Sequence, residues 1–100
     1  MAVEPDLARL LGAVAAGDRG ALRRVYEAQS VRLFGVANAI LRDRDAAADA
    51  LHDAFLRVSQ RAAQYDPARG AAAAWLAGVV RHAALDQARE VAERFAPVTA

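Results

Sequence analysis

The sequence contains no cysteine, so disulfide bonds and thiolate-ligated metal sites are both excluded. Lysine is also absent, and all thirteen basic residues are arginine. The formal net charge is only +1, which argues against a protein that coats nucleic acid through a strong positive field. Any contact with DNA is therefore expected to be local and to depend on a partner.

No apolar run approaches the ~20 residues that a membrane-spanning helix needs. The first residues, Met-Ala-Val-Glu-Pro-Asp, lack the basic and then apolar layout of a secretory signal. We therefore expect a soluble cytoplasmic protein with no membrane span.

Aromatic residues are few, whereas more than a quarter of the residues are alanine. Alanine favours helix but buries little apolar area. A chain of 100 residues with 56 % hydrophobic residues suits one domain with a single core. Stability should then depend on a few larger side chains, among them Phe55 and Trp75.

Apolar residues recur at helical spacing in four segments, which predicts an all-α, four-helix bundle-like domain. The first two helices are expected over 5–16, which begins near Pro5, and over 19–41, where Asp18 can cap the N-terminus. Asp43 or Asp45 caps the third helix, whose buried face is predicted to comprise Ala47, Ala50, Leu51, Ala54, Phe55, Val58 and Ala62. The fourth is expected over 71–94, with inward residues Trp75, Leu76, Val79, Ala83 and, as a further candidate, Val80. Residues 96–100 are expected to be a linker stub.

A short loop, Tyr65-Asp66-Pro67-Ala68-Arg69-Gly70, is expected between the third and fourth helices. Asp66 followed by Pro67 is typical of a turn, and Gly70 permits backbone angles that strain other residues. The segment is either an ordinary helix connection or a shaped binding loop.

Two exposed faces carry residues suited to binding. On the third helix, Asp49 and Asp53 lie one turn apart and can present paired carboxylates to a basic partner. They can equally form a solvated acidic face that is offset by Arg57 and Arg61.

The fourth helix places Gly78, His82 and Asp86 at steps of four. The arginines Arg69, Arg81 and Arg89 can hold phosphates or remain solvated. Trp75 lies on the apolar face, so packing in the core is favoured for it over contact with a nucleic-acid base.

Three motifs in order carry a family resemblance: residues 48–58 (Ala-Asp-Ala-Leu-His-Asp-Ala-Phe-Leu-Arg-Val), the loop 65–70, and Trp75-Leu76 with residues 79–86. Together they resemble region 2 of an extracytoplasmic-function (ECF) bacterial sigma factor over residues 1–95. The chain departs from the family at His52, where glutamine is usual, at Ser59, where an aromatic is common, and at His82, where asparagine is usual. A histidine bonds different base edges from an asparagine, so the resemblance does not specify which minus-ten promoter sequence the chain recognises.

The resemblance implies a sigma factor domain of transcription initiation, without enzymatic activity, cofactor or metal. It implies docking on the β′ clamp helices of core RNA polymerase through Asp49, His52, Asp53 and Leu56. It also implies that promoter DNA, as the single-stranded non-template minus-ten strand, contacts Tyr65, Asp66, Arg69, Gly70, Gly78, Arg81, His82, Asp86 and Arg89. A further partner would be an anti-sigma factor, and the region 4 domain that reads the minus-35 element is expected to be absent.

Two other classes compete with this interpretation. A helical protein-interaction module without autonomous DNA binding would explain the near-neutral charge. The pair His52-Asp53 with Asp49 is similar to a metal or phosphohydrolase centre. Such centres need several more ligands, and the only other histidine in the sequence is His82.

Overall fold

The computed structural model describes residues 6–95, and these residues are helical with no strand. The elements are α1 (Leu7–Ala15), α2 (Arg19–Leu41), α3 (Arg44–Arg61), the 3-10 turns η1 (Ala62–Gln64) and η2 (Pro67–Arg69), and α4 (Ala72–Arg94). The all-α, four-helix prediction is confirmed. The predicted start of the first helix at residue 5 and the linker stub at 96–100 lie outside the described residues.

Aspartates begin the first three helices. The carboxylates of Asp6, Asp18 and Asp43 each accept a hydrogen bond from the backbone N–H three residues later, at 3.1, 3.1 and 2.9 Å. Each bond satisfies one of the N–H groups that a helix start leaves unpaired. Asp43, and not Asp45, is therefore the cap of α3. The start of α4 differs, because its N-cap residue Ala71 has no side chain that can accept such a bond.

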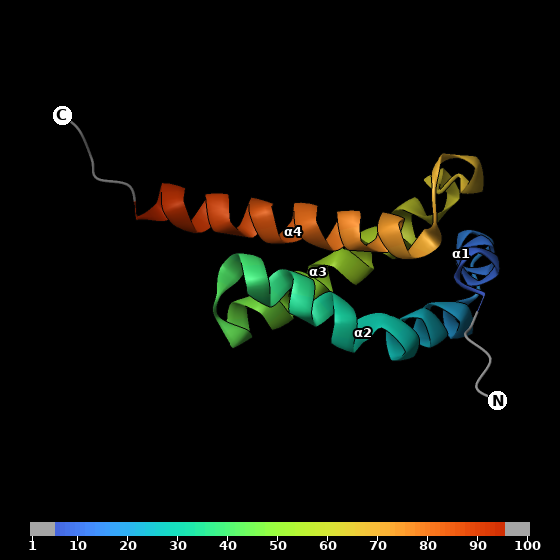
Figure 1. Cartoon of the computed structure of the whole chain (residues 1–100), viewed down its shortest axis with the longest axis horizontal. Helices are drawn as coiled ribbons and strands as arrows, with labels where there is room; N and C mark the ends of the chain where they lie inside the picture. The colour runs from blue at the N-terminus through green and yellow to red at the C-terminus, as the bar shows by residue number, and fades with distance from the viewer. Residues whose placement is uncertain (1–5, 96–100) are drawn as a thin grey trace.

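The two long helices α2 and α4 both pack against α3, and α1 lies at one end of the bundle beside the loop (Figure 1). Every residue predicted for the buried face of α3 is buried. The largest fully buried side chains are Leu11, Leu33, Leu76, Val25, Val58 and Val80, and half of the buried hydrophobic residues are alanine. The core is thus formed by close helix approach around a few larger side chains.

The inner face of α4 agrees with the prediction only in part. Val80 is only 1 % exposed, whereas Trp75 and Val79 are partly exposed at the edge of the core. Val80 follows Leu76 by four residues and therefore shares its face, while Trp75 and Val79 are each one residue, or about 100°, away. This shift brings the indole of Trp75 to the surface near the loop.

The C-terminal turns of α4 project beyond the other helices along the 58 Å long axis of the molecule (Figure 1). Residues 89–95 are all exposed, including Val91 at 44 % and Phe95 at 76 %. Between residues 6 and 95, no helix combines the length and apolar character needed to cross a membrane.

Candidate functional site

The loop between α3 and α4 has a shape defined by its own hydrogen bonds. The Tyr65 hydroxyl donates to the Gly70 carbonyl oxygen at 2.9 Å and so ties the first loop residue to the last. Inside the loop, an Asp66 carboxylate oxygen accepts from the Ala68 N–H at 2.9 Å, and the Arg69 N–H donates to the Asp66 carbonyl at 3.0 Å. Gly70 has a φ of +153°, an angle that favours glycine. The connection is therefore a shaped loop rather than an extended linker.

A cavity of about 320 Å³ opens beside this loop. Its volume is at the lower end of the range for ligand pockets, about 300–1,000 Å³. The walls carry both ring surface and polar groups, and the lining residues are Gln64, Tyr65, Asp66, Arg69, Gly70, Ala71, Ala74 and Trp75. The pocket can therefore accept one planar ring system with polar edges.

Trp75 contributes an aromatic wall that the sequence interpretation placed in the core. Its ring centroid lies 5.8 Å from that of Tyr65, with the planes tilted by 55°. Trp75 also packs against the buried residues of the main core. The indole thus supports the bundle on one side and lines the pocket on the other. The sequence held one indication of this: Trp75 immediately precedes the buried Leu76, so its side chain points about 100° away from the innermost face of α4.

The α3 face expected to bind polymerase is exposed as predicted, since Asp49, His52, Asp53 and Leu56 all lie on the surface. Leu56 is 51 % exposed. Asp53 forms an ion pair with Arg57 at 2.9 Å. No ion pair involves Asp49 within residues 6–95. The offset of acidic charge by Arg57 is thus seen for Asp53 and not for Asp49.

The α4 residues expected to contact DNA differ in how exposed they are and in whether other side chains already pair with them. Arg81, His82 and Arg89 are exposed, and Gly78 is partly exposed. Asp86 is engaged by two arginines, Arg57 of α3 at 3.0 Å and Arg89 at 3.6 Å. The structure therefore joins Asp53 and Asp86, which the sequence interpretation had placed on separate faces, through the single guanidinium of Arg57.

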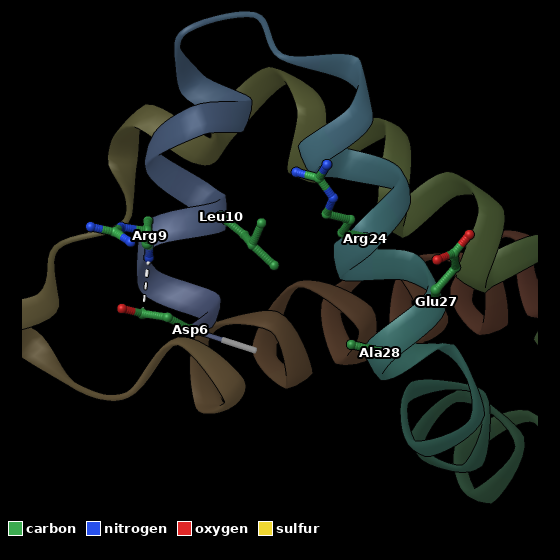
Figure 2. Close-up of a pocket in the computed structure, with 6 residues that line it drawn as sticks. All are labelled: Asp6, Arg9, Leu10, Arg24, Glu27 and Ala28. Atoms are coloured by element: carbon green, nitrogen blue, oxygen red, sulfur yellow. Dashed lines mark hydrogen bonds between the residues drawn. The ribbon is translucent and has the colours of Figure 1, made fainter. Parts of the chain in front are cut away.

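A second depression, of about 540 Å³, lies between α1 and α2, and sequence reasoning did not foresee it. Figure 2 shows Leu10 pointing from α1 toward α2, with Arg9 on the other side of α1. The lining residues are Asp6, Arg9, Leu10, Arg24, Glu27 and Ala28. Two acids and two arginines balance one another, so charge favours no ionic ligand there.

Across the described part of the chain, no group of three or more His, Cys, Asp or Glu residues could hold a metal ion.

Comparison with known families shows that residues 25–94 match the sigma-70 region 2 model. The match covers most of α2 and all of α3, the loop and α4. This chain belongs to the sigma-70 region 2 family. The region 2 resemblance that the motifs indicated is confirmed, while the roles of its individual residues stay predictions.

Curated relatives of this region 2 chain are ECF sigma factors. It is 32 % identical over 84 residues to the ECF RNA polymerase sigma factor SigK of Mycobacterium bovis BCG, covering 84 % of the chain and 45 % of that protein. It is 33 % identical over 87 residues to SigK of Mycolicibacterium vanbaalenii, covering 87 % of the chain and 44 % of that protein. The region 2 chain thus spans less than half the length of these relatives. No solved structure matches it.

Proposed function

We propose that this region 2 chain binds core RNA polymerase through α3 and captures a base of the single-stranded, non-template minus-ten strand in the pocket beside the loop. The observation that carries the proposal is the loop closed by the Tyr65–Gly70 hydrogen bond, next to the partly exposed ring of Trp75. An unstacked base needs ring surface on its faces and polar groups at its edges, and this pocket provides both.

The α4 helix continues from the pocket with residues suited to neighbouring nucleotides. Arg81 and Arg89 are exposed and can bond phosphates, which positions a strand without reading its sequence. His82 can donate to or accept from a base edge through its ring nitrogens, so it is the residue proposed to carry sequence preference. The balanced net charge of +1 supports a small number of phosphate contacts.

For polymerase docking, α3 offers two carboxylates one turn apart and an exposed leucine. Asp49 and Asp53 suit a basic surface on the β′ clamp helices, and Leu56, at 51 % exposure, supplies apolar contact. Such a mixture of charged and apolar groups is common at protein interfaces.

The second candidate is a helical protein-interaction module that does not bind DNA by itself, such as a domain bound by an anti-sigma factor. The exposed apolar residues Val91 and Phe95 on the projecting turns of α4 favour it. The two candidates differ in whether the isolated domain binds single-stranded DNA.

The main test of the proposal is oligonucleotide binding by the isolated domain. Fluorescence anisotropy at fixed salt should show preference for single-stranded non-template minus-ten oligonucleotide over duplex, with a shallow salt dependence. His82→Ala should flatten discrimination among sequences, whereas Arg81→Ala should weaken binding to all of them alike. Equal affinity for duplex and single strand, or unchanged discrimination in His82→Ala, would favour the protein-interaction module.

A second prediction concerns the loop bond. Tyr65→Phe removes only the hydroxyl that donates to Gly70, so we expect weaker base capture with a stability loss of about 0.5–1.5 kcal/mol. An oligonucleotide with 2-aminopurine at the captured position would report capture as a change in fluorescence. Tyr26→Phe is the matched control, because Tyr26 is 46 % exposed and lies on α2. Identical fluorescence titrations for the two variants would show that the Tyr65 hydroxyl does not support the pocket.

A further inference from the structure

The first turn of α4 forms one wall of the loop pocket, yet its own side chains hold it weakly. Ala71, Ala74 and Trp75 line the pocket. The N-cap residue Ala71 provides no side-chain cap for the helix. Residues 71–74 are all alanine, so before Trp75 this turn has only methyl groups with which to pack against the bundle. Its position therefore depends on contacts that other elements supply.

Arg32 of α2 supplies such a contact. Its Nη2 donates a hydrogen bond to the carbonyl oxygen of Ala73, at 3.1 Å. Within residues 6–95, no other hydrogen bond joins α2 to α4. The Nε of Arg32 donates to Oε1 of Gln29 at 2.8 Å, one helical turn back on α2. Gln29 thus holds the guanidinium in the orientation that reaches Ala73.

We propose that Arg32 is a positioning residue for the loop pocket, because it fixes the first turn of α4 and with it the ring of Trp75. This inference rests on the proposed function. The bonded carbonyl of Ala73 lies two residues before Trp75 in the same turn, so a shift of that carbonyl moves the indole. The opposite ring, of Tyr65, is held by the loop's own hydrogen bond to Gly70. A binding pocket must be kept within about 0.5 Å of its productive geometry, so both walls need an anchor.

A direct contact between Arg32 and the strand makes different predictions. The Arg32 side chain is exposed, and an arginine that bonds a phosphate adds affinity through its charge. Loss of one such contact lowers the salt dependence of log Kd by about 0.7 for a single strand. Gln29 would then have little effect on binding. A positioning role instead requires the Gln29 bond and leaves the salt dependence unchanged.

The first measurement uses the free protein. Trp75 is the only tryptophan in the chain, so its fluorescence reports the pocket wall without any ligand. We expect Arg32→Met and Gln29→Ala each to shift its emission to longer wavelength and to increase its quenching by acrylamide, while circular dichroism shows an intact fold. Arg23→Met is the matched control, because Arg23 is an exposed α2 arginine and its loss removes the same charge. It should leave the fluorescence unchanged.

The second measurement is the Kd for a fluorescent single-stranded minus-ten oligonucleotide at several salt concentrations. Arg32→Met should weaken binding about two- to tenfold, as expected for one lost hydrogen bond, with the salt dependence of Arg23→Met. Gln29→Ala should weaken it less. The variant that combines both changes should bind as Arg32→Met does, because the two residues act through one contact. Arg32→Lys keeps the charge and one donor but lacks the forked guanidinium, so its affinity should be intermediate.

Unchanged Trp75 fluorescence in both Arg32→Met and Gln29→Ala would overturn the inference. Equal losses of affinity in Arg32→Met and Arg23→Met would also overturn it. A salt dependence lowered only in Arg32→Met would replace it by a direct phosphate contact. If Trp75 responds as expected but the wild type binds no oligonucleotide, the proposed function fails, while the anchoring of the pocket wall by Arg32 is supported.

Discussion

Replacing Phe55 by alanine is expected to lower the free energy of unfolding by about 3–5 kcal/mol, a large share of the ~5–15 kcal/mol typical of a domain. Phe55 is 8 % exposed and meets the ring of Tyr26 edge-on, with centroids 5.0 Å apart. In a core where half of the buried hydrophobic residues are alanine, few neighbours can fill the resulting cavity. Urea denaturation followed by circular dichroism would measure the loss.

The next residue provides the matched control. Leu56 is 51 % exposed, so Leu56→Ala should change stability by no more than about 0.5 kcal/mol. Similar losses for Phe55→Ala and Leu56→Ala would contradict the assignment of the two faces of α3. Phe55 and Trp75 were both expected to contribute strongly to stability, but Trp75→Ala should cost less than Phe55→Ala because the indole is only partly buried.

The double variant Asp49→Arg/Asp53→Arg is expected to lose most of its binding to core RNA polymerase, by tenfold or more, with helicity nearly unchanged. Reversing both charges replaces attraction to a basic partner by repulsion, which costs an interface several kcal/mol. The ion pair between Asp53 and Arg57 is exposed on the Asp53 side and spans one helical turn, so its loss should cost only about 0.3–0.5 kcal/mol of stability. Surface-immobilised core polymerase would measure the affinity.

Glu27→Arg/Glu93→Arg is the control for this variant, because it makes the same change in net charge at exposed positions on α2 and α4. It should bind polymerase nearly as well as the wild type. If the Asp49 and Asp53 variant binds equally well, the docking surface must lie elsewhere on the domain.

Much of the fold follows from local rules that act along the sequence. The caps Asp18 and Asp43 lie where a short polar side chain precedes an apolar helical pattern. The buried face of α3 was fully predicted, because its leucine, phenylalanine and valine stand out against charged residues on the other side. In α4 the pattern was less informative, since alanine occurs on every side of the helix and permitted either Trp75 or Val80 as the inner residue.

The candidate site was less predictable because its contacts join residues from different elements. Motif order located the loop, but the bond from Tyr65 to Gly70 depends on how the 3-10 turns fold the segment back. Arg57 and Asp86 are 29 residues apart in the sequence, and only the packing of α3 against α4 brings them together. The shared guanidinium could not be deduced from helical periodicity, which describes one helix at a time.

The alanine-rich core also has a consequence for thermodynamics. A buried methyl group has no rotamer to immobilise, so each buried alanine costs almost no side-chain entropy on folding. It also hides little apolar surface from water, and that surface is the source of the positive heat capacity of unfolding. This chain should therefore unfold with a heat-capacity change below the usual ~12–15 cal/mol/K per residue. Its stability then varies unusually gently with temperature, along a curve broader than that of a domain built around leucine and phenylalanine.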